Sequence, residues 1–383
     1  MELLRLLRKI KKYFVRYNPS VEVIVSQTRL VENLKEYQQQ YPKLSFAPVL
    51  KSNAYGHGLV QVAEILDQEN IAFFVLDSLH EAIILRHNGI KSEILIIGYT
   101  QSENIKNSKL SKIAFTITSL EQLAEVASTL SSKTKIHLKI DTGMHRQGIQ
   151  TNQIKSSIEI IKTNKSLVLE GICSHFADAD NPDDETFTKS QIEEWERVVE
   201  LFKKNFPIIK FFHISATAGT YYSDQTNENV ARLGIGLYGI NPSPFTKLNL
   251  KPVLQMQSIV SSLKKLPAGE HIGYNITYKT KGAATIATIP VGYFEGVDRR
   301  LSNCGFSKIG SNYCPIVGRV SMNITSIDVT SVPNIKLDDK VIIISRNRDD
   351  KNSVESIAKI THTIPYEILV HIPQHLRRIV VGN

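Results

Sequence analysis

The stretch LSFAPVLKSNAYGHGLVQVAEILDQENIAFFVL, residues 44–76, contains the unit that decides the fold. A β-rich run is followed by glycine and small polar residues, then by an amphipathic helical segment and a second β-rich run. A strand, a crossover helix and a second strand form the repeating unit of α/β proteins. The stretch therefore predicts an α/β fold.

The same alternation continues along the chain. Eight β-rich runs with helical segments between several of them, over about two hundred residues, favour a (β/α)8 TIM barrel over an open doubly wound sheet. The runs lie at 44–50, 71–76, 93–98, 114–118, 135–140, 167–175, 209–215 and 230–239.

The pattern changes at NPSPFTKLNLKP, residues 241–252, where three prolines precede short strands with tight turns and one late helical segment, SVESIAKITH. We therefore expect a basic N-terminal extension over 1–19, a barrel over 20–250 and a smaller, mainly-β C-terminal domain over 251–383.

Lys51 lies where the first barrel strand ends, and active sites of such barrels lie at the carboxyl ends of the strands. An unprotonated amine at this position can bind a carbonyl compound covalently. Position alone also allows a solvent-facing lysine at a strand end. The residues around Lys51 decide between these interpretations.

The segment PVLKSNAYGHG, residues 48–58, closely resembles the pyridoxal-phosphate lysine motif of the alanine racemases. The resemblance implies that Lys51 binds the cofactor aldehyde and that Tyr55 contacts the cofactor phosphate. SHFADAD and FHISATAG are similar to two further family segments. They imply that His175 lies near the cofactor ring and that Thr217, where serine is usual, binds the phosphate.

KIHLKIDTGMHRQG, residues 135–148, is similar to the family signature KxDTGMxRxG. The period of two in a strand places Lys139 on the polar side of this run, together with His137 and Asp141, and this side is expected to face the barrel mouth. The resemblance implies that Arg146 contacts the cofactor phenolic oxygen and the substrate carboxylate. It also implies that Lys139 is carbamylated, because two cations this close would repel.

RLGIGLYG, residues 232–239, contains the spacing G-x-G-x-x-G. This pattern indicates dinucleotide binding only when it opens a helix, and the following INPSPF cannot continue one, so we reject a Rossmann fold. The backbone N–H groups of Gly234 and Ile235 can instead donate to a phosphate. Arg232 resembles the family arginine that bonds the pyridine nitrogen, which weakens the ring as an electron sink and favours simple return of a proton.

Racemisation needs proton transfer on both faces of the α-carbon, so one base is insufficient. HIGYNITYKT resembles the family motif that supplies the second base, here Tyr274, linked through His175 to Arg232.

Other C-terminal segments resemble the rest of the family site. They imply Tyr293 at the substrate entrance, the Met322 backbone N–H on the substrate carboxylate, and Tyr366 on the phosphate. In the family, residues matching Tyr274, Tyr293 and Met322 enter the neighbouring barrel. The resemblance therefore implies a head-to-tail homodimer.

Several positions depart from the family pattern. Asn323 and Glu295 stand where aspartates are usual, Ala216 stands where asparagine is common, and HIPQHLRR, residues 371–378, replaces an RVPR-like sequence. A charged pair near the C-terminus is therefore expected to be missing or rebuilt, and the Asn323 position leaves the substrate preference open.

The leading hypothesis is a pyridoxal-phosphate-dependent isomerase that interconverts L- and D-alanine with Lys51 and Tyr274 as bases, supplying D-alanine for peptidoglycan. One alternative is a racemase of serine or of broad specificity. Another is a non-catalytic pyridoxal-phosphate-binding protein, against which the C-terminal tyrosine domain argues. A barrel-type decarboxylase is disfavoured, because such enzymes pair the cofactor nitrogen with a carboxylate rather than with arginine.

Composition excludes other classes of protein. About five of the nine net positive charges lie in the first sixteen residues, so the body is only mildly basic and a nucleic-acid partner is not expected. That segment suits a helix packed on the body better than one lying on an anionic membrane, and it lacks the apolar stretch of a signal peptide. Three cysteines without metal-ligand or redox spacing predict a cytoplasmic protein with no metal.

Overall fold

The computed structural model describes residues 18–382, and these residues form two compact units. One, the barrel unit, comprises Val25–Leu254, Ile364–His371 and 380–382. The other, the C-terminal unit, comprises 18–24, 255–363 and 372–379. The basic segment for which helix packing or membrane contact was predicted lies outside the described residues.

Parallel strands form the centre of the barrel unit, and the predicted (β/α)8 barrel is confirmed. Six of them, β3 to β8, pair in chain order in one parallel sheet, and β2 pairs with β9. The ring is closed by a bridge between Val49 and Val75 and by hydrogen bonds from Asn229 to Phe212 and from Arg232 to Ser215. The strands are β2 (Ser45–Pro48), β3 (Phe74–Leu76), β4 (Ile94–Ile96), β5 (Ile113–Ile117), β6 (Thr134–Lys139), β7 (Leu167–Cys173), β8 (Phe211–His213) and β9 (Val230–Leu233).

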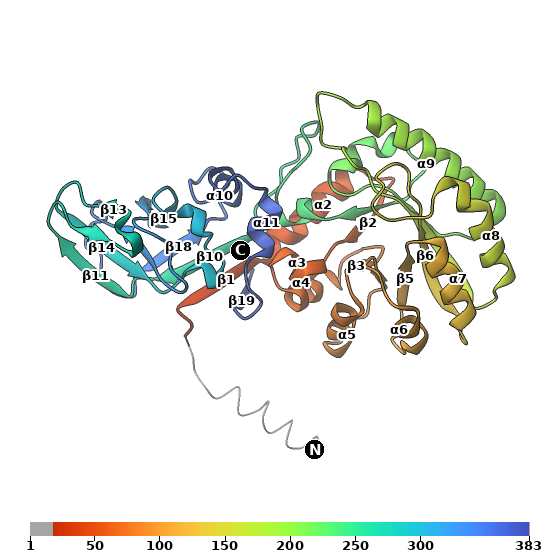
Figure 1. Cartoon of the computed structure of the whole chain (residues 1–383), viewed down its shortest axis with the longest axis horizontal. Helices are drawn as coiled ribbons and strands as arrows, with labels where there is room; N and C mark the ends of the chain where they lie inside the picture. The colour runs from red at the N-terminus through yellow and green to blue at the C-terminus, as the bar shows by residue number, and fades with distance from the viewer. Residues whose placement is uncertain (1–17, 383) are drawn as a thin grey trace, which may run out of the picture. The chain divides into compact units, whose positions relative to one another are not determined.

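Helices surround these strands in Figure 1. Ser26, Ser78 and Ser119 cap α2, α5 and α7, because each side-chain oxygen accepts a backbone N–H of the first turn. The longest helix of the unit, α9, buries an apolar stripe at helical spacing that includes Trp195 and Phe202. The helices are α2 (Gln27–Gln40), α3 (Lys51–Tyr55), α4 (Leu59–Leu66), α5 (Leu79–His87), α6 (Ser102–Asn107), α7 (Leu120–Thr129), α8 (Ile154–Thr163), α9 (Thr186–Asn205) and α11 (Pro365–Val370).

The C-terminal unit is mainly β. Its strands form a six-stranded sheet in the order β16-β15-β18-β10-β1-β19, a three-stranded sheet β11-β14-β17 and a hairpin β12-β13. The predicted late helix is α10 (Val354–Ile360), whereas α11, which carries Tyr366, was not predicted. The strands are β1 (Val21–Ser26), β10 (Leu254–Ile259), β11 (Ser262–Leu266), β12 (His271–Ile272), β13 (Tyr278–Lys279), β14 (Ala284–Ile289), β15 (Phe306–Ile309), β16 (Asn312–Pro315), β17 (Thr325–Asp328), β18 (Lys340–Ile344) and β19 (Arg377–Val381).

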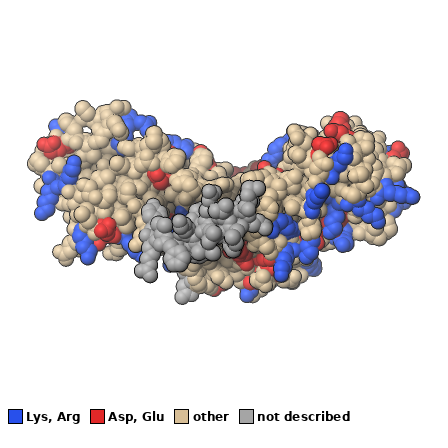
Figure 2. All heavy atoms as spheres, turned by 90° about the horizontal axis from the view of Figure 1, so that it is seen from below, with Lys and Arg blue, Asp and Glu red and all other residues tan. Residues whose placement is uncertain are grey.

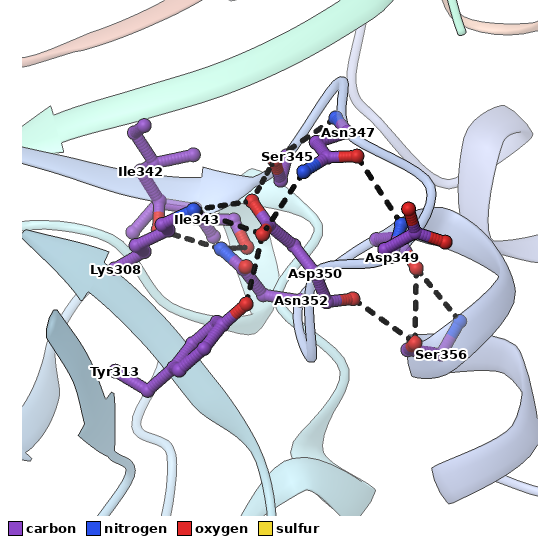
Figure 3. A network of polar contacts seen from close by, with 11 residues as sticks. Lys308, Tyr313, Ile342, Ile343, Ser345, Asn347, Asp349, Asp350, Asn352 and Ser356 are labelled. Atoms are coloured by element: carbon purple, nitrogen blue, oxygen red, sulfur yellow. Dashed lines mark hydrogen bonds and ion pairs between the residues drawn. The ribbon is translucent and has the colours of Figure 1, made fainter. Parts of the chain in front are cut away.

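A polar network centred on Asp350 ties β15, β16 and the loop after β18 together (Figure 3). The Asp350 carboxylate accepts hydrogen bonds from Lys308 Nζ, the Tyr313 hydroxyl and the Ser345 hydroxyl at 2.8, 2.8 and 2.6 Å. The Asp350 carboxylate is paired with these donors in a largely buried place, so the network fixes the loop that leads into α10.

Charged side chains are spread over the face seen in Figure 2, with Asp and Glu among Lys and Arg. Among residues 18–382, no helix combines the length and the apolar composition that a membrane crossing requires.

Candidate active site

A cavity of about 700 Å³ lies at the carboxyl ends of the barrel strands, and its lining belongs to the barrel unit. Ten of the thirteen predicted site residues line it. They are Lys51, Tyr55, Lys139, Arg146, His175, Thr217, Arg232, Gly234, Ile235 and Tyr366. Residues up to 315 positions apart in sequence thus meet in one place, as the barrel topology predicts.

Lys51 opens a left-handed turn. Ser52, Asn53, Ala54 and Tyr55 all have φ between 50° and 57°, a region that costs an L-residue roughly 1–2 kcal/mol. The turn is held by hydrogen bonds from the Ser52 N–H to the Glu81 carboxylate and from the Leu59 N–H to the Asn53 side chain, at 2.8 and 2.9 Å. Strain of this kind persists where surrounding contacts fix it, and it is common at functional sites.

One end of the cavity is a cradle of hydroxyl and backbone N–H groups. Thr217 Oγ1 accepts the N–H groups of Gly234 and Gly236 at 3.1 and 3.3 Å, just where a short 3-10 helix begins (Ile235–Tyr238). A Cβ on Gly234 would lie 3.1 Å from the Tyr55 hydroxyl, so a side chain there would enter the cradle. Burial raises the pKa of Tyr55 to about 12 and keeps its hydroxyl a donor. The Tyr366 ring lies 6.0 Å from that of Tyr55.

Arg232, at the end of β9, is buried and donates hydrogen bonds to several acceptors. Its NH1 donates to His213 Nδ1 at 2.8 Å and its NH2 to His175 Nδ1 at 3.0 Å, and both also donate to backbone carbonyls. Among the described residues, no acceptor is bonded to the Arg232 Nε–H. This group is the donor left for a ligand in the cavity.

Both histidines beside Arg232 are neutral. Burial, together with the charge of Arg232, lowers the pKa of His175 to about 3 and that of His213 well below its usual value. Arginine has no acceptor, so Nδ1 of His175 must accept and its proton lies on Nε2. The predicted contact between His175 and Arg232 is thus present.

Lys139 and Arg146 bring two more cations to the cavity. Burial, with the charges of Arg232 and Arg146, lowers the pKa of Lys139. Asp141 does not join them at the barrel mouth, because its carboxylate accepts the N–H groups of Gly143 and His145, each at 3.0 Å. It shapes the loop that carries Arg146.

Several residues that line the cavity had no predicted catalytic or binding role. His213 and Cys173 line it, and His137, which was expected to face the mouth, is 1% exposed and lies inside the barrel. Of these residues, only His213 and His137 could have been recognised from the sequence, because each is an imidazole within an otherwise apolar strand.

The other three predicted residues lie in the C-terminal unit. Tyr274, Tyr293 and Met322 are 70%, 44% and 56% exposed, an unusual state for large apolar side chains. Tyr293 and Met322 share one substructure, because the N–H groups of Tyr293 and Phe294 donate to the carbonyls of Ser321 and Met322 at 3.0 and 2.9 Å.

Comparison with known proteins identifies this arrangement. The family model "Alanine racemase, N-terminal domain" matches residues 25–242, and "Alanine racemase, C-terminal domain" matches residues 253–380. "Alanine racemase 1" of Caldanaerobacter subterraneus subsp. tengcongensis is 36% identical over 91% of this chain and 92% of that protein. The alanine racemase of Methanococcus maripaludis is 35% identical over 91% and 95%.

Solved structures agree with the sequence comparison. The alanine racemase of Clostridium difficile 630 has a TM-score of 0.88 at 30% identity, over 96% of this chain and 97% of that one. The Bacillus anthracis enzyme with bound L-Ala-P has a TM-score of 0.87 at 30% identity, over the same shares of both chains. With both domains matched and relatives aligned over nearly their whole length, the chain belongs to the alanine racemase family.

Proposed function

We propose that this chain interconverts L- and D-alanine with pyridoxal phosphate, in an active site completed by a second copy of the chain. The observation that carries this proposal is the convergence, on one cavity, of a strand-end lysine, a cradle of hydroxyl and backbone N–H groups, and a buried arginine whose Nε–H has no bonded acceptor among the described residues. When bound, pyridoxal phosphate supplies an aldehyde for the substrate amine and an electron-withdrawing ring that acidifies the α-carbon.

The cavity residues fit this group. Lys51 would hold the aldehyde carbon covalently. Thr217, Tyr55, Tyr366 and the Ile235 N–H would bind the phosphate, because together they offer hydroxyl and backbone donors without a bulky side chain. The Gly234 N–H, which donates to Thr217 Oγ1 here, would exchange that acceptor for the phosphate. No carboxylate of the described residues is hydrogen-bonded to any of these donors.

Arg232 would donate its Nε–H to the pyridine nitrogen. Arginine does not give up its proton under physiological conditions, so this nitrogen would stay unprotonated. The site would then stabilise a carbanion only weakly. Prompt return of a proton is favoured over transamination or decarboxylation, which suits racemisation.

Lys51 Nζ would be released when the substrate amine replaces it on the aldehyde carbon. The free Lys51 amine and the phenol oxygen of Tyr274 of the partner subunit would then move protons on opposite faces of the α-carbon. His175 can donate only from Nε2, since Nδ1 accepts from Arg232. That N–H would stabilise the phenol oxygen when it has lost its proton. Arg232 would therefore orient the second base through His175.

Substrate orientation would come from the carboxylate. Arg146 at the cavity and the backbone N–H of Met322 of the partner subunit would bind it, with Tyr293 of the partner subunit at the entrance. The exposure of Tyr274, Tyr293 and Met322 supports a head-to-tail homodimer that buries them. We further propose a cytoplasmic role in supplying D-alanine for peptidoglycan, which the three free thiols favour.

The test is proton exchange in heavy water. Purified protein loaded with pyridoxal phosphate is incubated with single L-amino acids, and deuterated D-product is measured after chiral separation. Alanine should racemise with deuterium at the α-carbon. Tyr274→Phe should abolish inversion in both directions, whereas Tyr278→Phe, a tyrosine of the neighbouring strand β13, should retain it.

Other outcomes identify the alternatives. Racemisation of serine but not alanine would contradict the substrate assignment. Absence of any exchange, with the cofactor still bound, would indicate a pyridoxal-phosphate-binding protein without catalysis. Borohydride reduction followed by peptide mapping must place the label on Lys51, and an unlabelled Lys51 would refute the proposal as a whole.

A further inference from the structure

A row of buried polar side chains leads from Arg232 into the barrel interior. Arg232 NH1 lies 2.8 Å from His213 Nδ1, His213 Nε2 lies 2.8 Å from His137 Nδ1, and His137 Nε2 lies 3.9 Å from the Glu170 carboxylate. The four residues come from adjacent strands β9, β8, β6 and β7, and each is at most 8% exposed. We call this row the histidine relay.

The proton positions in the relay follow from Arg232. Because arginine can only donate, His213 Nδ1 accepts and His213 carries its proton on Nε2. That N–H donates to His137 Nδ1, so the proton of His137 lies on Nε2. Every donor therefore points away from Arg232 and toward one carboxylate, which lies at ion-pair rather than direct hydrogen-bonding distance.

Packing fixes the ring of His137 independently of Glu170. A Cβ on Gly171 would lie 2.7 Å from His137 Nδ1, so glycine provides the room for the imidazole. The ring also stacks on Phe211 and meets Phe73 edge-on, at centroid distances of 5.7 and 5.6 Å. Glu170 thus contributes its charge to the relay rather than the position of the ring.

The charges around the relay support this assignment. Burial alone would raise the pKa of Glu170, but contacts with His137 and Lys135 lower it to about 2, so the carboxylate is ionised. Burial lowers the pKa values of His137 and His213, which are neutral. The other titratable groups around the relay are Lys135 and Lys210 beside Glu170, Glu93 on Lys135, and Glu228, which is bonded to Ser215 near Arg232. On the cavity side, Lys139, Cys173 and His175 lie near Arg232.

We propose that Glu170 is a positioning residue that acts through His137 and His213 to hold Arg232 in place against the cofactor ring. Its charge polarises both imidazoles toward itself and strengthens His213 Nδ1 as the acceptor of Arg232 NH1. The Nε–H then stays directed at the cavity. This inference rests on the proposed function, because it assigns a task to the residue that would bind the pyridine nitrogen.

The chain offers a matched control. Glu170 and Glu93 both contact Lys135 Nζ, at 3.0 and 3.1 Å, but only Glu170 faces His137. We compare Glu170→Gln with Glu93→Gln as full-length holoenzymes. The readouts are the absorption spectrum of the bound cofactor against pH, and kcat and KM for alanine in both directions.

Glu170→Gln should lower kcat roughly 3- to 30-fold, with KM changed by less than about twofold, and should shift the pH dependence of the cofactor band. Glu93→Gln should match the wild type in all three. Glu170→Asp keeps the charge and should recover the wild-type spectrum. Identical behaviour of Glu170→Gln and Glu93→Gln would overturn the inference, as would a Glu170→Asp spectrum as altered as that of Glu170→Gln.

Two further outcomes are informative. If Glu170→Gln fails to fold, Glu170→Asp against Glu93→Gln still decides, because a normal spectrum and kcat for the aspartate variant support the role of charge and altered ones contradict it. Borohydride labelling of Lys51 in the wild type distinguishes failure of the proposed function from failure of the inference about Glu170. An unlabelled wild type refutes the proposed function, whereas a labelled, active wild type with an unaffected Glu170→Gln variant refutes this inference alone.

Discussion

The side-chain amide of Asn323 donates a 2.7 Å hydrogen bond to the buried carboxylate of Glu295. The other carboxylate oxygen accepts the Gly292 N–H at 2.8 Å, so the pair joins the turn of Tyr293 to the loop of Met322. These are two positions where the chain departs from the aspartates usual in the family. The Asn323 amide supplies a donor to the Glu295 carboxylate, which a second carboxylate at position 323 would instead repel.

Asn323→Asp should therefore destabilise the protein and impair catalysis. Two carboxylates at this distance repel, and a lost bond to a buried charged group costs about 1–3 kcal/mol. We expect that loss in the free energy of unfolding by denaturant titration, together with a lower kcat/KM for alanine.

The double variant Asn323→Asp with Glu295→Gln reverses the pair and should recover most of both losses, since the glutamine amide can donate to the new carboxylate. Recovery of neither quantity would show that the pair has no positioning role.

Lys139 should carry a carbamate. Burial and the neighbouring arginines lower its pKa, so more of the amine is unprotonated at neutral pH and able to react with carbon dioxide. Protein equilibrated with carbon-13 bicarbonate should give a carbamate carbon signal that Lys139→Ala lacks. Lys189→Ala, on the exposed side of α9, should keep the signal. Absence of the signal from the wild type would leave Lys139 as a free amine beside Arg146.

The left-handed turn after Lys51 should gain stability from glycine. Ser52 is exposed with φ of 56°, so Ser52→Gly removes strain that outweighs the extra entropy of the unfolded chain. We expect an increase of about 0.5–1 kcal/mol in the free energy of unfolding. Ser128→Gly, in the right-handed helix α7, should lose about as much. If the free energy of unfolding changed in the same direction in both variants, the strain argument would be contradicted.

Acid should destabilise the fold below about pH 6.5, the ordinary pKa of histidine. The folded pKa of His175 is about 3, and those of His137 and His213 are also lowered, chiefly by burial. Between these values the unfolded chain binds more protons than the folded one. The contribution of these histidines to the free energy of unfolding is therefore fully present above the unfolded pKa. It decreases as the pH is lowered, by about 1.4 kcal/mol per pH unit for each histidine.

Denaturant titrations between pH 6.5 and 5 measure this slope. His137→Gln should reduce this slope by about one histidine's share. An unchanged slope in His137→Gln would mean that His137 does not contribute to the acid sensitivity.

The sequence determined the barrel and much of the cavity. Periodicity and the crossover helices indicate all eight barrel strands, because buried parallel strands are short apolar runs that differ from amphipathic helices. The family motifs lie at strand ends, so Lys51, Arg232 and His175 could be predicted to meet. The short helix α11 could not be predicted, since six residues after a proline give too little periodicity, and its place in the barrel unit depends on long-range contacts.

Only the tertiary structure decided how these residues act on one another. Glu170 looks like an ordinary strand residue, and the sequence does not show which partner the His137 imidazole has. Their relation to Arg232 exists because adjacent barrel strands place them in one buried row. Likewise, the sequence shows Asn323 and Glu295 only as two separate positions without the usual aspartate. The structure shows that their side chains are hydrogen-bonded to each other. A sequence records which groups are present, but their protonation and pairing depend on burial and on distances between residues far apart in the chain.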